Sequence, residues 1–144
     1  MTTDTTIEPT VDQAAVGEFV GQVAADVAAA MSAPLVWLGD KLGLYHAMAD
    51  SQPVTPAVLA RRAGTNERMT REWLCNQAAS GYVTYHPPDG TFTLPPEHAV
   101  VLAVDSPAFL QGGFDLVTAV HRSIDKAVDA MRTGQGPRMA RPSP

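Results

Sequence analysis

The sequence predicts a mainly α-helical fold with one small β-hairpin, arranged around a single core. Five segments of the 144-residue chain place apolar residues at intervals of three and four, the spacing of one helix face. Two short segments between Gly81 and Pro95 instead alternate with the period of two that is typical of strands. The composition, 45% hydrophobic and 17% charged, suits one buried core at this chain length.

Both ends of the chain differ in composition from the part between them. Residues 1–12 are polar, contain no Lys or Arg, and predict a disordered leader. Residues 134–144 have no apolar period and are rich in proline, so they predict a disordered tail. Residues 13–133 are therefore expected to form one domain.

Two helices are expected before residue 50. Residues 16–31 carry one apolar stripe, and Pro34 should end or kink this helix because proline lacks an amide donor and clashes with the preceding turn. A second helix is expected over residues 34–49, with the proline in its first turn. Gly39 and Gly43 indicate a close approach by another helix, because glycine otherwise costs a helix roughly 1 kcal/mol.

End signals define the next two helices. The dipeptide Thr55-Pro56 is an N-terminal signal and Gly64 is a C-terminal one, so a short helix is expected over residues 56–62. Thr65 is then expected to cap a helix over residues 66–80.

A hairpin and a long helix complete the predicted domain. Residues 82–85 and 91–94 predict two strands, joined by a turn that contains two prolines, an aspartate and a glycine. A short helical turn is expected over residues 97–103. Apolar residues then keep helical spacing from residue 107 to residue 131, which predicts a long last helix.

The order of these elements indicates a specific architecture. Helix, short helix, helix and hairpin follow one another across residues 35–94, which is the arrangement of a winged helix-turn-helix with the hairpin as its wing. The full prediction is a winged helix-turn-helix flanked by long dimerisation helices.

The two flanking helices are longer than a winged helix requires. Their apolar stripes exceed what a core of about 60 residues can bury, and an intertwined homodimer would cover them. A larger monomeric helical layer is the alternative. The dimer hypothesis places these residues at the interface: Phe19, Val20, Val23, Val27, Val117, Ile124 and Val128.

Nucleic-acid binding is the second function class that this fold suggests. The helix over residues 66–80 would be the recognition helix, with Arg68 and Arg71 as the first candidate contacts. The formal net charge is −5, and residues 82–94 of the wing contain no Lys or Arg. Because phosphate binding depends on such cations, binding to DNA is expected to be weak. The arginines then form a solvated face or pair with Glu67 and Glu72.

Several segments resemble the N-terminal region of class I S-adenosylmethionine-dependent methyltransferases of the actinobacterial or mycobacterial type. The resemblance covers about residues 15–133, and five segments carry it: 37–45, 55–65, 71–74, 79–83 and 92–99. It implies a winged-helix dimerisation domain that helps cover the substrate pocket of a following catalytic domain.

The family's cofactor motif has no counterpart in the sequence. A methyl-donor site needs a glycine-rich loop after a strand and an acidic residue after the next strand. Gly134 and Gly136 form the only Gly-x-Gly, and they follow a predicted helix. We therefore expect no cofactor and no catalytic residues, and a module that is catalytically incompetent alone. A transcriptional regulator is the alternative function, and a remnant without an independent role is a third.

Metal, redox and membrane roles find little support in the sequence. Cys75 is the only cysteine, and no two histidines have metal-ligand spacing, so we expect neither a disulfide nor a metal site. In mid-helix, Cys75 is expected to be a small buried or half-buried residue rather than a nucleophile. The most apolar run, residues 23–38, is interrupted by Asp26, Ser32 and Pro34. A cytoplasmic protein without membrane contact is predicted.

Overall fold

The computed structural model describes residues 10–104 and 112–136. It separates into two compact units, residues 1–31 and residues 32–144. Most of the predicted leader, the start of the predicted last helix and most of the predicted tail lie outside the described residues.

The first helix, α1, is longer than the sequence indicated. It runs without a break over Gln13–Lys41, with Pro34 inside it. Asp12 begins it by accepting a hydrogen bond from the amide of Ala14 at 2.9 Å. The predictions of a boundary at Pro34 and of a separate helix over residues 34–49 are therefore wrong. Proline removes only one amide donor, and the alanine-rich turns before it favour continued helix.

A turn and two short helices follow α1. The chain leaves the helix at Gly43, whose φ of +66° suits glycine, and forms a 3₁₀ turn over His46–Met48. Helix α2, Pro56–Ala63, begins where the Thr55 hydroxyl accepts a hydrogen bond from the amide of Val58. It ends at Gly64, whose φ is also +66°. Both predicted ends of this helix are confirmed to within one residue.

Helix α3 covers Glu67–Ala79, close to the prediction, but its cap is a different residue. The Asn66 side chain accepts a hydrogen bond from the amide of Met69 at 3.2 Å, so Asn66 caps the helix and Thr65 does not. The Thr65 hydroxyl instead bonds the hydroxyl of buried Thr70 at 2.7 Å. Thr65 therefore joins the turn to the inner face of α3.

The predicted hairpin is present, with shorter strands than expected. Strands β1, Thr84–His86, and β2, Thr91–Thr93, pair antiparallel with Tyr85 opposite Phe92. Val54 exchanges two backbone hydrogen bonds of 2.9 Å with Phe92, which ties the hairpin to the segment before α2. Helix α4 follows at Pro96–Leu102, and helix α5 covers Gly112–Thr133.

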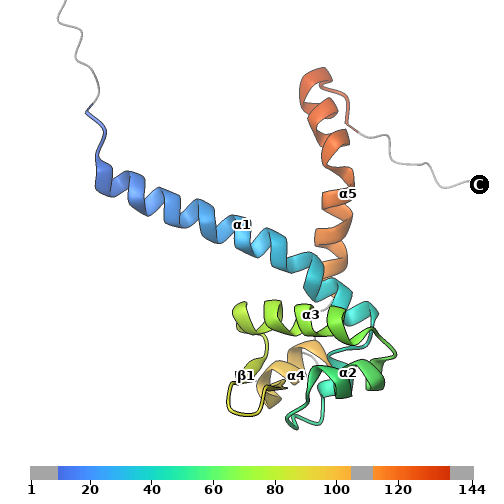
Figure 1. Cartoon of the computed structure of the whole chain (residues 1–144). Helices are drawn as coiled ribbons and strands as arrows, with labels where there is room; N and C mark the ends of the chain where they lie inside the picture. The colour runs from blue at the N-terminus through green and yellow to red at the C-terminus, as the bar shows by residue number, and fades with distance from the viewer. Residues whose placement is uncertain (1–9, 105–111, 137–144) are drawn as a thin grey trace, which may run out of the picture. The chain divides into compact units, whose positions relative to one another are not determined.

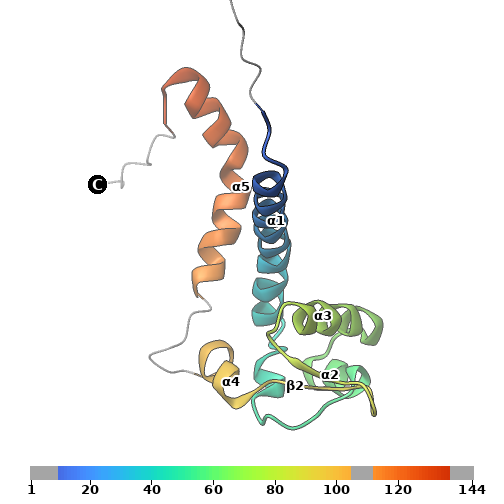
Figure 2. The same cartoon turned by 90° about the vertical axis from the view of Figure 1, so that its left-hand side faces the viewer.

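The core lies within the second unit, where the views of Figures 1 and 2 gather α2, α3, α4 and the hairpin into one body. The Trp73 ring meets Tyr45 edge-on at 5.1 Å, and its indole nitrogen donates to the carbonyl of Leu35 at 2.8 Å. Gly39 permits this packing, because a Cβ there would lie 2.4 Å from the Trp73 ring. The expected close approach is confirmed at Gly39 and is wrong at Gly43, which lies beyond the end of α1 and where a Cβ would meet nothing within 4 Å. The largest fully buried side chains are Tyr45, Leu44, Met48, Leu59, Leu74, Leu94, Gln77, Val36 and Val54.

Candidate interaction surfaces

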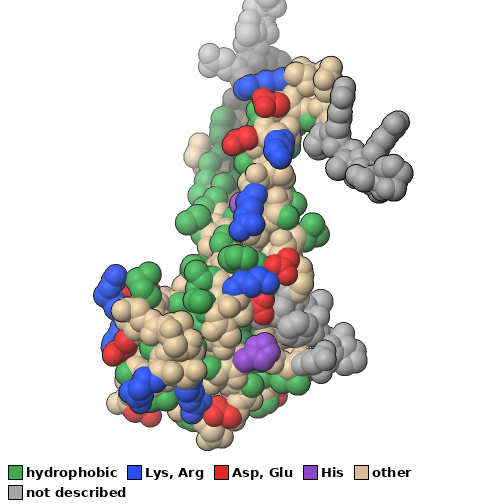
Figure 3. All heavy atoms as spheres, turned by 90° about the vertical axis from the view of Figure 1, so that its right-hand side faces the viewer, with side chains coloured by type: hydrophobic (Ala, Val, Ile, Leu, Met, Phe, Trp, Pro, Cys, Tyr) green, Lys and Arg blue, Asp and Glu red, His purple; other side chains and the backbone are tan. Residues whose placement is uncertain are grey.

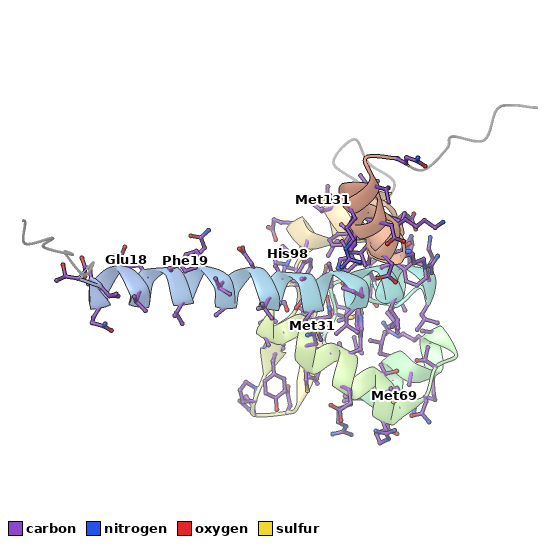
Figure 4. All side chains as sticks on the ribbon, turned by 90° about the horizontal axis from the view of Figure 1, so that it is seen from above. Glu18, Phe19, Met31, Met69, His98 and Met131 are labelled. Carbon is purple, nitrogen blue, oxygen red and sulfur yellow. The ribbon has the colours of Figure 1, made fainter. Side chains whose placement is uncertain are left out.

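The first part of α1 carries a stripe of exposed apolar side chains. Phe19 is 64% exposed and Val20 is 61% exposed, and Val23 and Val27 are exposed as well. Figure 4 shows the Phe19 side chain standing off the α1 ribbon. All four residues that the sequence assigned to an interface on this helix are thus accessible on a single chain.

Helix α5 carries a second exposed stripe. No residue of α5 is buried, and Ile124 and Val128 are exposed while Val117 is half-buried. Leu116, which was not among the predicted interface residues, is 67% exposed. Leu116 precedes Val120 and Ile124 at intervals of four, so helical spacing would have found Leu116 as well. In Figure 3, hydrophobic side chains are exposed along the long helices as well as on the body.

A polar cluster joins α5 to the last turns of α1 within the second unit. The Trp37 indole nitrogen donates to the Asp115 carboxylate at 2.7 Å, and the Lys41 ammonium lies 3.2 Å from the same oxygen. The Trp37 hydrogen bond and the Lys41 charge hold the pKa of Asp115 below its usual range. Lys41 and Arg122 lie 5.7 and 5.8 Å from the centre of the Trp37 ring. Sequence reasoning had no signal for this long-range cluster.

The candidate DNA-contact residues lie on the exposed face of α3. Arg71 forms an ion pair of 3.3 Å with Glu67 one turn earlier. The sequence predicted this pairing as the alternative to phosphate contact. Arg68 is exposed and forms no hydrogen bond or ion pair with the described residues. On the neighbouring helix, Arg62 pairs with Asp50 at 3.1 Å. Two arginines of the helix-turn-helix are therefore already engaged by acidic side chains.

The wing offers an acidic group and no cation. The Asp89 carboxylate accepts a hydrogen bond of 2.9 Å from the Thr91 hydroxyl, which lowers the pKa of Asp89. His86 bonds the Thr93 hydroxyl across the hairpin at 2.9 Å. Since residues 82–94 contain no Lys or Arg, the wing carries no permanent positive charge for a phosphate backbone.

An apolar cavity of about 350 Å³ lies between the last turns of α1 and α3. Leu38, Leu42 and Met69 line it and remain exposed, and Trp73 closes its inner side. Its few polar members include Thr65 and Thr70, which bond each other. The cavity therefore presents apolar surface and no arrangement of catalytic groups.

The remaining candidates from the sequence are readily placed. Cys75 is exposed on the outer face of α3, so the expectation that it is buried or half-buried is wrong. Its neighbours Trp73, Leu74 and Gln77 take the inward positions of that helix. Among the described residues, no group of three or more His, Cys, Asp or Glu side chains could hold a metal ion. By length and composition alone, α1 could cross a membrane.

Solved structures of methyltransferases share this fold over most of the chain. The mitomycin 7-O-methyltransferase MmcR superposes with a TM-score of 0.69 at 22% identity, over 86% of this chain and 37% of its own. Human N-acetylserotonin methyltransferase in complex with SAM gives 0.68 at 17% identity, over 91% and 38%. The dimethyltransferase RosA from Streptomyces davawensis gives 0.65 at 23% identity, over 83% and 34%.

These matches concern part of each enzyme. The chain spans between one third and about two fifths of the length of these structures, and the identities are low, so the likeness is one of fold. It agrees with the resemblance to a methyltransferase N-terminal domain that the sequence motifs carried.

A family model gives the assignment from sequence. No curated protein matches the chain. The model described as the Rv2258c-like winged HTH domain matches residues 29–104, from the last turns of α1 through α4. The matched residues contain the helix-turn-helix of α2 and α3 and the wing of β1 and β2, and the chain belongs to the family of Rv2258c-like winged HTH domains.

Proposed function

We propose that this chain is a homodimerisation module of the kind found in methyltransferases, in which two copies pair through α1 and α5. The observation that carries the proposal is the uncovered apolar stripe on each of these helices. Six large apolar side chains of the first part of α1 and five of α5 are exposed: Val16, Phe19, Val20, Val23, Val27, Met31, Leu116, Val120, Ile124, Val128 and Met131.

The energy available from covering these stripes supports pairing. Complete burial of a Val, Ile or Phe side chain is worth about 1.5–3 kcal/mol, so covering a half-exposed one contributes about 1 kcal/mol. Soluble monomers rarely expose contiguous apolar patches of this extent. A symmetric interface uses each stripe twice, once from each copy, which doubles the covered area.

The charges on α1 favour an apolar protein surface as its partner. Between Gln13 and Asp40 the helix carries Glu18 and Asp26 and no Lys or Arg. Such a helix has no cation for a phosphate backbone or an anionic lipid surface. A second copy of the same chain supplies an apolar stripe of equal length, and binding to it requires no cation on α1.

The proposal assigns a supporting role in methyl transfer. Full-length enzymes with this fold include one whose structure holds SAM. In such a protein the pair would hold two catalytic domains together, and the residues of the present chain would bind no methyl donor. Calorimetry with S-adenosylmethionine should therefore give no saturable heat. We further propose that the chain is cytoplasmic and that α1 is covered by its partner rather than by lipid.

The mass of the purified chain in sedimentation equilibrium at micromolar concentration tests the proposal. We expect twice the chain mass of 15.2 kDa. Val20→Asp combined with Ile124→Asp should give a monomer, because each places a charge inside the proposed interface. A folded unmodified chain that sediments at 15.2 kDa would contradict the proposal.

A matched variant separates pairing from net charge. Gln22→Asp combined with Thr133→Asp adds the same two charges at exposed positions away from the stripes. This variant should remain a dimer. Monomers from both double variants would show that added charge alone disrupts the assembly.

A further inference from the structure

Helix α5 has no buried face that could fix its direction relative to the winged-helix body, so other contacts must fix it. None of its residues is buried, and Phe114 near its start is only partly buried where it packs against the core cluster. A helix with so few inward side chains could turn on the body. Its polar contacts with α1 meet at one aromatic side chain.

That side chain is Trp37, and three charged residues surround it. The Asp115 carboxylate accepts the indole N–H at 2.7 Å and lies 3.2 Å from the Lys41 ammonium. Lys41 also lies over the Trp37 ring, as does the Arg122 guanidinium, each within 6 Å of its centre, where a cation is attracted by the ring electrons. Trp37 is thus contacted through both its N–H and its ring.

The spacing of these residues fixes a face of each helix. Trp37 and Lys41 are four apart on α1, and Asp115 and Arg122 are seven apart on α5, so each pair lies on one side of its helix. Leu116, at 100° around α5 from Asp115, begins the stripe that continues through Val120 and Ile124. Holding Asp115 and Arg122 against Trp37 therefore turns the apolar stripe away from the contact.

We propose that Trp37, Lys41, Asp115 and Arg122 form a clamp that fixes the direction of α5 on the winged-helix body and presents its apolar stripe outward. The four residues act as positioning residues for the helix. The part of the inference that connects the clamp to pairing rests on the proposed function. The clamp itself does not, because all its contacts lie within one chain.

Two substitutions remove different parts of the clamp. Trp37→Phe keeps an aromatic ring for the two cations and removes the N–H donor. Asp115→Asn keeps an oxygen acceptor for the indole and removes the charge that attracts Lys41. Asp125→Asn is the matched control, because it removes the same charge from α5 at a residue without a hydrogen bond or ion pair among the described residues.

The direction of α5 can be measured as a distance within one chain. Nitroxide labels at the exposed native Cys75 on α3 and at position 129 in an Asp129→Cys variant report it by pulsed electron resonance. Mixing with an excess of unlabelled Cys75→Ser chain removes distances between copies. We expect a narrow distribution in the parent and the Asp125→Asn chain, and one about twice as wide in Trp37→Phe and Asp115→Asn.

Two results would overturn the clamp. One is a parent distribution as broad as that of the variants, and the other is a distribution that neither substitution widens or that Asp125→Asn widens equally. Sedimentation of the same samples separates this inference from the proposed function. A monomeric parent with the expected widths retains the clamp and rejects pairing, whereas a dimer with unchanged widths rejects the clamp alone.

Discussion

The winged-helix body and the two long helices treat their apolar residues in opposite ways. In the body, Leu44, Leu59 and Leu74 are at most 1% exposed. In the first part of α1 and throughout α5, no residue is buried. The helices nevertheless carry apolar side chains at regular spacing, just as the body does.

The difference separates two sources of stability. The body is closed by long-range contacts, such as Trp73 with Tyr45, that one chain supplies in full. An isolated helix gains little from its backbone alone, since most helical stability in proteins comes from packing an amphipathic face. The body therefore gains its stability within one chain, whereas the long helices leave their apolar faces exposed.

The largest expected effect compares a buried leucine of the body with an exposed valine of α1. Leu74→Ala should lower the free energy of unfolding by about 2–5 kcal/mol, because it leaves a cavity in a closed core. Val20→Ala should change the unfolding of a dilute chain by less than about 0.5 kcal/mol and weaken association instead. Urea denaturation and sedimentation measure the two quantities. Equal losses of unfolding free energy would end the distinction between the regions.

Glycine substitutions sharpen the comparison within α1 itself. A Cβ at Gly39 would lie 2.4 Å from Trp73 and 2.8 Å from Tyr45, so Gly39→Ala should cost about 1–3 kcal/mol through overpacking. Gly21 has open space around its Cα, and Gly21→Ala should stabilise the helix by up to about 1 kcal/mol. Thermal unfolding followed by circular dichroism compares the two. A destabilising Gly21→Ala would reveal a close partner at that position.

Local signals predicted the body well, and the reason is physical. Thr55 and Gly64 act on backbone groups within their own turn, so the sequence places both ends of α2 without knowledge of the rest of the fold. The hairpin follows in the same way from its turn and its period of two. The exchange between Val54 and Phe92 was missed because it joins residues 38 positions apart.

The features that were predicted wrongly or not at all have a common cause. Local sequence preferences compete with contacts between residues that are far apart in the sequence. Pro34 disfavours helix locally, yet one lost hydrogen bond does not divide a 29-residue helix. The contact between Trp37 and Asp115 spans 78 residues, and no spacing rule connects them. For the candidate surfaces, the apolar period identified Phe19 and Ile124 as residues that the core does not bury. Their place in an interface with a second copy of the chain stays a prediction.

Acid should loosen the attachment between the body and α5. Trp37 and Lys41 lower the pKa of Asp115 below the ordinary aspartate pKa of about 4. The contribution of the Asp115 carboxylate to stability is therefore complete above about pH 4. It is lost as the pH falls through the lowered pKa. Asp40 and Arg122 are the other charged groups of this cluster. Nuclear magnetic resonance of the indole N–H groups measures the change.

The second tryptophan provides an internal control for that titration. The Trp73 indole donates to the Leu35 carbonyl, which does not titrate, so its signal should stay constant while that of Trp37 moves. Asp115→Asn should remove the movement at Trp37. A Trp37 signal that is unchanged between neutral and acidic pH in the unmodified chain would contradict the observed hydrogen bond.

The smallest expected effect concerns DNA, where the body rather than the long helices would be the binding surface. Arg71 is paired with Glu67 and the wing has no cation, so binding to random duplex DNA should be weak and unspecific. Arg68→Ala and Arg71→Ala should each reduce the slope of log K against log salt by about one at most. Arg132→Ala at the end of α5 is the control, and it should leave the slope unchanged. A sequence-specific complex at physiological salt that Arg71→Ala abolishes would make the body a DNA-reading module and assign the long helices a role in spacing its half-sites.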